Sequence, residues 1–128
     1  GSIDLNHFKT INDSFGHDVG DECLRAFADG VRANPVDGMV FARVGGDEFT
    51  LLLPGFDRQE GERYAARLRT YFEDHPITLG PVPFALRFAI GFGSYPEDGV
   101  DLTSLLHVAD QRMYLDKAAS RDISAIPR

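Results

Sequence analysis

The stretch Arg43-Val44-Gly45-Gly46-Asp47-Glu48-Phe49 lies between two short apolar segments, Met39 to Val44 and Phe49 to Leu53. Two apolar runs of strand length joined by a glycine pair predict a β-hairpin, because glycine adopts the positive φ angles that a tight turn needs. The tip of this hairpin then carries two adjacent carboxylates and no side chain at its glycines. Such a tip lets a large ligand approach the backbone closely, and it suits a metal-bound polyphosphate.

Composition sets the class of protein. The chain has 128 residues, of which 43% are apolar, with a formal net charge of -7. We expect one domain over residues 1–128, and no apolar run is long enough to cross a membrane. The acidic balance argues against a nucleic-acid binder, since such proteins use basic patches, so a phosphate bound here needs a cation. The single Cys23 rules out an internal disulfide, fits a reducing cytoplasm and is expected to fill the core.

Hydrophobic spacing predicts helices and strands that alternate around the hairpin. Gly16 and Gly20 are expected to divide the first helical region into two helices, and Asp57 with Glu60 forms a capping-box pattern at the start of another. The predicted helices cover residues 8–32, 57–72 and 102–118, and the further predicted strands cover 84–92 and 123–126. This order favours an α+β fold with a mainly antiparallel central sheet covered by helices.

Further polar motifs flank the hairpin in a fixed order. Asp4-Leu5-Asn6-His7-Phe8-Lys9 offers another acid, and the segment from Asn12 to Glu22 adds Asn-Asp, Gly-His and Gly-Asp pairs. Late in the chain come Ala109-Asp110, Met113-Tyr114, Lys117 and Arg121. With Arg43 to Phe49, these motifs give the chain a pattern that resembles the GGDEF domain of bacterial diguanylate cyclases. Several separated motifs at matching spacing are specific, whereas a lone Gly-Gly-Asp would be weak.

The resemblance implies a sandwich with a ferredoxin-like core, similar to the palm domains of nucleotide cyclases and polymerases. In that fold an apolar strand occupies the middle of the sheet and runs directly into the position of Asp4. Only three residues precede Asp4 here. We therefore expect the chain to lack its first strand, which would leave two sheet edges and an apolar face open unless another segment or chain fills the slot.

The resemblance also implies an activity. Diguanylate cyclases condense two GTP into cyclic di-GMP with release of pyrophosphate, as a two-fold dimer of half-sites, and usually carry an upstream sensor or dimerisation segment. GTP carries about four negative charges, which proteins commonly balance with Mg²⁺ on oxygen ligands. The family's ligands for Mg²⁺ (or Mn²⁺) correspond to Asp4, the Leu5 carbonyl and Asp47. Glu48 corresponds either to a ligand of a second metal or to a group that helps deprotonate the ribose 3′-hydroxyl, and Gly46 leaves room for the substrate.

The substrate-binding residues follow from the same correspondence. Phe8-Lys9 opens a helix, whose free backbone N–H groups favour phosphate. Asn12 and Asp21 match the family's guanine-reading pair, and a carboxylate suits the N1–H and N2–H₂ donors of guanine. Lys117 and Arg121 match a late basic pair that reaches the phosphates.

Each of these residues alone has a plainer interpretation. Asp4 could cap a strand end, Asn12 and Asp21 are common in turns and helix caps, and Lys117 and Arg121 would ordinarily be solvated cations at a helix end. Those interpretations give way only because the motifs occur together. The histidines show no zinc-ligand spacing, so none is assigned to a metal.

Two departures from the family pattern stand out. Asn6 occupies the place of a frequent second aspartate, and the positions of a family inhibitory site, R-x-x-D, read Val36-Asp37-Gly38-Met39, so no inhibitory site is expected. Two rivals stay open. One is a non-catalytic module that binds GTP or cyclic di-GMP and signals to a partner. The other is a cyclase that makes a mixed adenine-guanine product, which Asp21 disfavours.

Overall fold

In the described part of the chain, the fold is a mixed α+β arrangement of four helices around a small sheet. The computed structural model describes residues 1–79 and 82–120. No helix among these residues is both long and apolar enough to span a membrane. The elements in chain order are β1 (Ser2–Leu5), α1 (Phe8–Phe15), α2 (His17–Arg32), β2 (Val40–Gly45), β3 (Glu48–Leu52), α3 (Arg58–Asp74), β4 (Ile77–Leu79), β5 (Val82–Phe84), β6 (Phe88–Gly91) and α4 (Leu102–Ser120).

The main sheet has four antiparallel strands in the order β2-β3-β1-β6, and β4 with β5 forms a separate hairpin. β1 is therefore central, although it is only four residues long. Its Asp4 lies opposite Glu48 of β3 and Ala89 of β6. The sheet edges that we expected to be open are thus paired along residues 2–5, because the short β1 already bonds to both neighbours.

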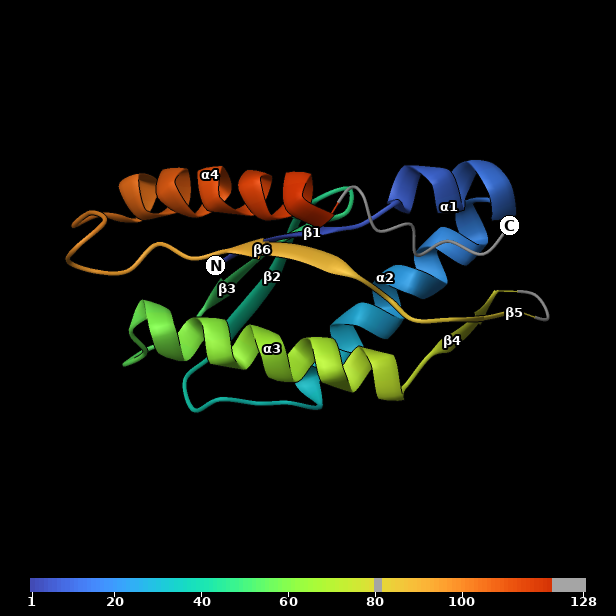
Figure 1. The fold of residues 1–128 in the computed structure, drawn as a ribbon, viewed down its shortest axis with the longest axis horizontal. Helices are drawn as coiled ribbons and strands as arrows, with labels where there is room; N and C mark the ends of the chain where they lie inside the picture. Colours follow the sequence, from blue (N-terminus) through green and yellow to red (C-terminus); the bar gives the residue numbers. More distant parts are fainter. Residues whose placement is uncertain (80–81, 121–128) are drawn as a thin grey trace.

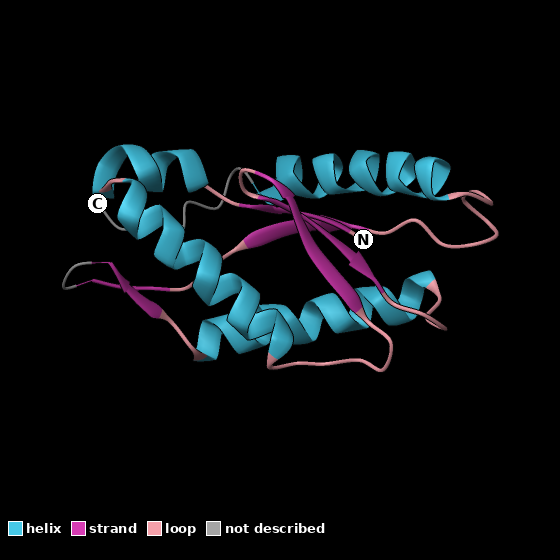
Figure 2. Cartoon of the chain, turned by 180° about the vertical axis from the view of Figure 1, so that it is seen from behind, coloured by secondary structure: helices cyan, strands magenta, loops and turns pink. Residues whose placement is uncertain are grey.

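The sheet separates one helix from two others. In Figure 1, α4 lies above the strands and α3 lies below them, and Figure 2 shows from behind how α2 runs diagonally from α1 toward α3. The core fills the space between the sheet and the pair α2 and α3. At its centre the ring of Phe27 lies 5.1 Å from that of Phe49, 5.2 Å from Phe72 and 5.4 Å from Phe88. These aromatic contacts join α2 to α3 and to two strands, so they fix where the strand ends lie.

On the opposite face, α4 packs directly on the backbone of β6 and the loop that follows. A Cβ on Gly91 would lie 2.1 Å from the Met113 nitrogen, and one on Gly93 would lie 2.4 Å from the Leu105 carbonyl oxygen. No other residue type fits at such an approach. The glycines therefore set the distance of α4 from the sheet, and through it the height of every side chain that α4 projects toward the strand ends.

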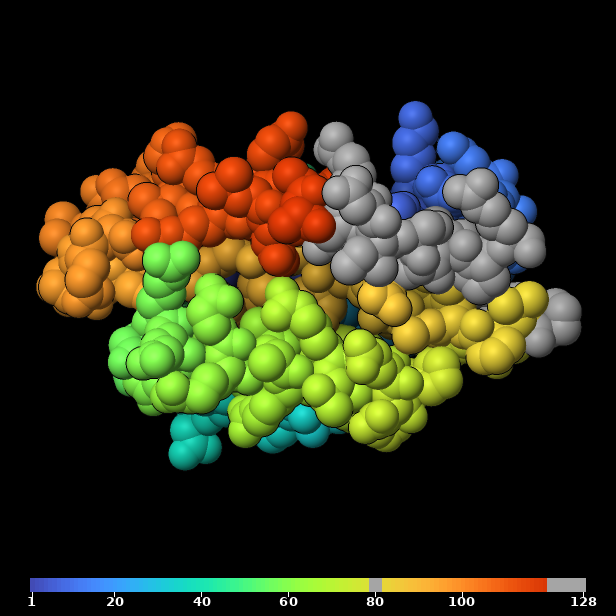
Figure 3. Space-filling view, viewed as in Figure 1, coloured from blue at the N-terminus to red at the C-terminus, as the bar shows by residue number. Residues whose placement is uncertain are grey.

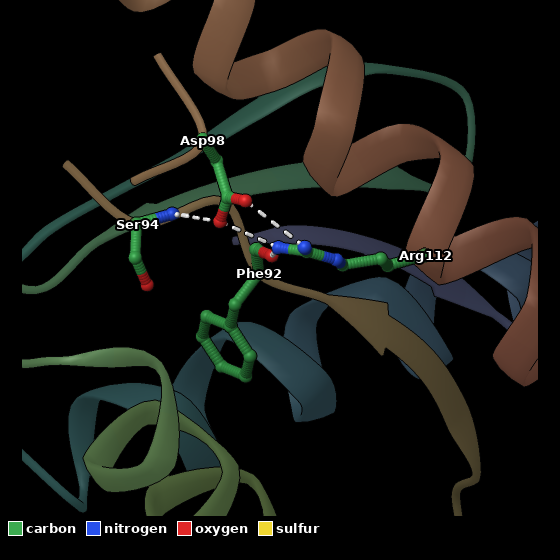
Figure 4. Close-up of polar contacts among 4 residues, drawn as sticks. All are labelled: Phe92, Ser94, Asp98 and Arg112. Carbon is green, nitrogen blue, oxygen red and sulfur yellow. Dashed lines mark hydrogen bonds and ion pairs between the residues drawn. The ribbon is translucent and has the colours of Figure 1, made fainter. Parts of the chain in front are cut away.

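A second contact ties α4 to the loop after β6 (Figure 4). Arg112 Nη1 and Nη2 donate to the two carboxylate oxygens of Asp98 at 2.6 and 3.0 Å, and Nη1 also donates to the Phe92 carbonyl at 2.7 Å. The Ser94 amide donates to Asp98 Oδ2 at 2.9 Å. This bidentate arrangement gives both carboxylate oxygens a donor and holds the loop against the helix.

The free edge of β6 is covered by side chains from both helices. The Ile90 amide donates to Asp116 Oδ2 at 3.0 Å, and Arg69 Nη2 lies 3.2 Å from the same oxygen. Figure 3 shows α3 and α4 on either side of β6 on this face. The carboxylate thus occupies a backbone donor that another strand could otherwise pair with.

Two details differ from the sequence prediction. Gly16, with φ of 92°, does separate α1 from α2, but Gly20 lies inside α2, where the absence of a Cβ accommodates Asn12. The predicted strand over residues 84–92 is instead two short strands, β5 and β6, in different sheets, because residues 85–87 leave the extended pairing. The predicted capping box is confirmed, since Asp57 and Glu60 exchange hydrogen bonds at 2.7 and 3.1 Å. The strand predicted over residues 123–126 lies outside the described residues.

Candidate functional site

Adjacent strand ends bring two of the predicted carboxylates together. Asp4 is the penultimate residue of β1, and Asp47 lies at the tip between β2 and β3. The Leu5 amide donates to the Asp47 carbonyl at 3.1 Å, which fixes the tip against the end of β1. Asp4 is buried, with 8% of its side chain exposed, so one carboxylate lies below the surface and the other lies beside it.

A lysine from the far end of the chain completes this group. Lys117, near the C-terminal end of α4, places its Nζ 2.7 Å from Asp4 Oδ2. The hydrogen bond to Asp4 raises the pKa of the Lys117 ammonium, and the charges of Asp4, Asp47 and Glu48 act in the same direction. One ammonium therefore faces three carboxylates across the end of the sheet.

Asp47 is the group whose protonation is most altered. Burial, then a hydrogen bond to Asp4 and the charge of Asp4, raise its pKa from 3.8 to about 6, while its own backbone amide and Lys117 act in the opposite direction. Two carboxylates this close resist ionising together, and one ammonium does not offset both. A cation bound between them would remove that conflict.

Buried oxygen atoms without donors point to the same need. Oδ1 of Asp4 and Oδ1 of Asn6 are buried and have no hydrogen-bond partner in the part of the chain that the structure describes. Carboxylate and amide oxygens are hard donors that suit Mg²⁺ or Mn²⁺. The residues present fit such a cation, but they supply only some of its ligands. Among residues 1–79 and 82–120, no three His, Cys, Asp or Glu side chains converge in ligand geometry. The remaining ligands would come from carbonyls, water or a bound phosphate.

A cavity opens directly beside these carboxylates. It has a volume of about 340 Å³ and is lined by residues from the end of β1, the start of α1, the hairpin tip and α4: Leu5, Asn6, His7, Phe8, Lys9, Asp47 and Lys117. The N-cap of α1, His7, makes no side-chain cap hydrogen bond, so the cap residue does not occupy the first-turn N–H groups that favour anions. The cavity thus combines oxygen donors, a helix N-terminus and two lysines.

A larger cavity of about 670 Å³ lies at the other end of β1, between β3 and the loop after β6. None of the predicted site residues lines it. Its size alone is no argument for function, because the chemistry is concentrated at the smaller cavity.

The predicted guanine-reading pair lies apart from the carboxylates. Asn12 lies in α1, and its Oδ1 is buried without a hydrogen-bond partner. It fits against Gly20 of α2, where a Cβ would lie only 1.8 Å from that oxygen. Asp21 follows Gly20 and is exposed. Helix packing therefore brings the Asn12 side chain beside the residue next to Asp21, although neither residue lines the cavity.

The other predicted residues are placed as follows. Gly46 has φ of 47°, and its carbonyl accepts from Arg43 Nε at 2.8 Å, which braces the tip. Glu48 is exposed and starts β3. Arg121 lies outside the described residues, so its predicted contact with phosphate stays a prediction.

Sequence reasoning missed two features of the site. His7 adopts a left-handed backbone with φ of 61°, which turns the chain from β1 into α1. The sequence offers no signal for this, although Asn6 before it is a common turn residue. The pairing of Lys117 with Asp4 was also missed, because 113 positions separate the two residues and no local pattern links them.

Comparison with known proteins identifies the family. Residues 2–122 match the family described as diguanylate cyclase, GGDEF domain. The response regulator PleD of Caulobacter vibrioides is 35% identical over 122 residues, which cover 94% of this chain and 27% of PleD. The cyclic di-GMP phosphodiesterase NbdA of Pseudomonas aeruginosa is 35% identical over 120 residues, which cover 94% of this chain and 15% of NbdA.

Solved structures share the fold. The GGDEF domain of TpbB (YfiN) from Pseudomonas aeruginosa superposes with a TM-score of 0.85 at 34% identity, over 92% of this chain and 74% of that one. The active GGEEF domain of a diguanylate cyclase from Vibrio cholerae gives a TM-score of 0.83 at 31% identity, with the same coverage of both chains. The chain spans about a third or less of the length of the curated relatives compared here.

Proposed function

Because the chain belongs to the GGDEF domain family of diguanylate cyclases, we propose that it condenses two molecules of GTP into cyclic di-GMP and releases pyrophosphate. The observation that carries this proposal is the convergence of Asp4 and Asp47 beside a cavity that also holds Lys9 and Lys117. Paired carboxylates with a buried unpaired oxygen suit a divalent cation, and the cations beside them suit a polyphosphate.

The proposed metal ligands are Asp4, the Leu5 carbonyl and Asp47. A bound Mg²⁺ or Mn²⁺ supplies charge neutralisation at the phosphates and acidifies an oxygen in contact with it. Glu48, exposed at the start of β3, is free to approach a second cation or the ribose 3′-hydroxyl. The raised pKa of Asp47 supports a cation at this place, since a positive charge there favours the ionised form of both carboxylates.

The proposed substrate contacts surround these ligands. Backbone N–H groups at Phe8 and Lys9 bind phosphate at the start of α1, and Lys117 with Arg121 adds side-chain cations. Gly46 leaves the tip open to the nucleotide. Asn12 and Asp21 read the guanine edge, in keeping with the unpaired Asn12 Oδ1. This placement puts the base over α1 and α2 and the triphosphate over the end of the sheet.

The proposed reaction needs two copies of the chain. In each half-site the 3′-oxygen of one GTP attacks the α-phosphorus of the other, the bond to the β-phosphate oxygen breaks, and pyrophosphate leaves. The hydroxyl proton passes to a base, for which Glu48 is the candidate. Repeating the step from the second half-site closes the ring, so the products are one cyclic di-GMP and two pyrophosphates. A two-fold dimer presents the two nucleotides face to face.

The test is a turnover assay at high protein concentration. Purified protein is incubated with GTP and Mg²⁺, and cyclic di-GMP is followed by chromatography beside Asp47→Ala. Product from the unmodified protein that disappears in the variant supports the proposal. Equal product from both proteins would contradict the role of Asp47. Because the proposed reaction needs two copies of the chain, the assay is repeated with a fused dimeriser.

The alternative is a non-catalytic module that binds GTP or cyclic di-GMP and signals to a partner. One observation favours it: relatives that match most of this chain include NbdA and PdeR, which are named as cyclic di-GMP phosphodiesterases. Nucleotide binding by calorimetry without any product, in the dimerised protein, would support this alternative. Competition between ATP and GTP in the same assay separates a guanine-specific enzyme from one that makes a mixed product.

The cellular setting follows from the proposed activity. We place the protein in the cytoplasm, with GTP as substrate, a second copy as partner and an upstream sensor as its regulator. Without the R-x-x-D pattern at residues 36–39, product is not expected to inhibit through that site. Adding low micromolar cyclic di-GMP to the working enzyme checks this, and strong inhibition would contradict it.

A further inference from the structure

Lys117 places its ammonium against one of the carboxylates proposed to bind the metal. Its Nζ lies 2.7 Å from Asp4 Oδ2, and Asp4 is 8% exposed. The other oxygen of the same carboxylate, Oδ1, is buried without a hydrogen-bond partner. A protein that binds a cation only through Asp4 and Asp47 would leave this carboxylate free for it, whereas here an ammonium already neutralises part of the charge.

A count of the charges suggests why Lys117 and a metal would compete for Asp4. With Asp4, Asp47 and Glu48 ionised, one ammonium leaves two negative charges uncompensated. A divalent cation in its place leaves one negative charge and frees the ammonium. Both cations cannot hold Asp4 at bonding distance without strong mutual repulsion. Lys117 is able to leave, because 42% of its side chain is exposed and it lies near the end of α4.

We propose that Lys117 is a resident cation of the carboxylate site, which a divalent metal must displace from Asp4 and which then transfers to a phosphate of the arriving nucleotide. This inference rests on the proposed function for the metal and nucleotide, and adds that Lys117 couples them. Lys117 thereby has two alternative partners, a carboxylate in the empty site and a phosphate in the loaded one.

The coupling has a defined direction. A metal that arrives alone must break the ion pair and leaves the ammonium without a partner, so metal alone binds weakly. A nucleotide supplies that partner, so metal and nucleotide each raise the affinity of the other by the same factor. Replacing Lys117 with a neutral residue removes the competitor as well as the phosphate contact. It therefore strengthens binding of metal alone and weakens the coupling.

The test measures Mn²⁺ binding by calorimetry and electron paramagnetic resonance, with and without a GTP analogue that has a methylene bridge between the α- and β-phosphates. Lys117→Met is expected to bind Mn²⁺ alone about tenfold more tightly than the unmodified protein, as removal of one competing ion pair allows. The gain in Mn²⁺ affinity from the analogue should shrink in the same variant. Lys117→Arg, which keeps the charge, should stay close to the unmodified protein.

Lys9→Met is the matched control. Lys9 and Lys117 are the two lysines of the chain, and both line the cavity. Lys9 differs because it is exposed and makes no contact with Asp4 in the described structure. It should change the affinity for Mn²⁺ alone by less than about twofold, through net charge only. If Lys117→Met binds Mn²⁺ alone no more tightly than Lys9→Met does, the proposed exchange of Lys117 for a metal at Asp4 is wrong.

The outcomes also separate this inference from the proposed function. Tight Mn²⁺ binding that depends on Asp4 and is unaffected by Lys117→Met overturns the exchange and leaves the metal site intact. Absence of Mn²⁺ binding from every variant, even with the analogue, overturns both. As a second readout, Mn²⁺ alone should increase the reactivity of the Lys117 amine toward acetic anhydride, measured by mass spectrometry, with Lys9 as the internal reference. An unchanged ratio while Mn²⁺ is bound would contradict displacement.

Discussion

Helix α4 carries two ion pairs, and they differ in how completely their groups are satisfied. Near the middle of the helix, Arg112 gives a donor to each oxygen of Asp98 and one to the Phe92 carbonyl (Figure 4). Near its C-terminal end, Lys117 bonds to one oxygen of Asp4 and leaves the other without a partner. The Arg112 pair gives each carboxylate oxygen a donor, whereas the Lys117 pair leaves one oxygen of Asp4 without a donor among the described residues.

This difference distinguishes a charge pair that holds a loop from the charged groups of the proposed binding site. At the Arg112 pair the hydrogen bonds lower the pKa of Asp98, because they favour its ionised form. At the Lys117 pair the neighbouring Asp47 has its pKa raised to about 6, first by burial and then by Asp4. A pair that serves only to hold a loop gains from complete hydrogen bonding, while a site that must accept a ligand keeps unpaired groups and their electrostatic conflict.

The largest expected effect comes from a substitution beside the Lys117–Asp4 pair. Asp47→Asn should lower the proposed cyclase activity about 1,000-fold, since it removes a charged metal ligand while keeping the shape of the side chain. The folded state should survive, because the substitution removes a repulsion. Steady-state turnover and thermal unfolding are measured together, with Asp74→Asn at the end of α3 as an exposed control. Loss of activity through unfolding, seen as a lower Tm, would contradict the assignment.

The second effect comes from removing the Arg112–Asp98 pair. Arg112→Met should lower the free energy of unfolding by about 1 to 2 kcal/mol. The Phe92 carbonyl and Asp98 Oδ1 lose their Arg112 donor, and Asp98 Oδ2 keeps only the Ser94 amide. Urea unfolding measures this, with Arg25→Met on the exposed face of α2 as the control. Turnover per folded molecule should stay within about threefold, since the pair does not touch the site. A much larger loss of turnover would show that the two ion pairs of α4 are coupled.

A third test uses the raised pKa of Asp47. In the metal-free protein the folded state binds more protons than the unfolded state between pH 3.8 and about 6. The free energy of unfolding should therefore fall as the pH rises through this range, by about 1 kcal/mol once solvent screening of a half-buried carboxyl is counted. Asp47→Asn should remove this fall. Saturating Mn²⁺ should also remove it, and a profile that rises in all three cases would refute the interpretation.

The smallest expected effect has the opposite sign. The pKa of Asp98 is lowered by Arg112 and the Ser94 amide, so its contribution to stability is present above the ordinary value of 3.8 and is lost as the pH falls through the folded value. Asp98→Asn should flatten the acid limb of the pH–stability profile measured by urea unfolding. If its acid limb matches that of the unmodified protein, the pair contributes little in solution.

Much of the fold could be predicted from local patterns. The hairpin around Gly46, the capping box at Asp57 and Glu60, and the helices themselves depend on residues close in sequence, and the structure contains all of them. The errors also have a local origin. Gly20 resembles a helix breaker in sequence, but packing against Asn12 gives it a place inside α2. The apolar run over residues 84–92 does not reveal that its middle leaves the sheet.

The candidate site could be predicted only in part. The motifs identified Asp4, Asp47 and Lys117 as members of one site through a family resemblance. The partners within the site could not be predicted, because the ion pair from Lys117 to Asp4 depends on the height of α4 above the sheet. That height is set by Gly91 and Gly93, which touch the helix backbone directly. Nor does sequence reveal the left-handed turn at His7.

The sequence by itself determined the family, the acidic hairpin tip and the candidate residues for a metal and a nucleotide. These depend on residue type and on short spacing along the chain. Only the tertiary structure decided that Asp4 already has an ammonium for a partner, that its other oxygen has none, and that the Arg112 pair is complete. The physical reason is that charge interactions depend on distance and burial in space, and residues that are far apart in the chain share them only after the helices and sheet have packed.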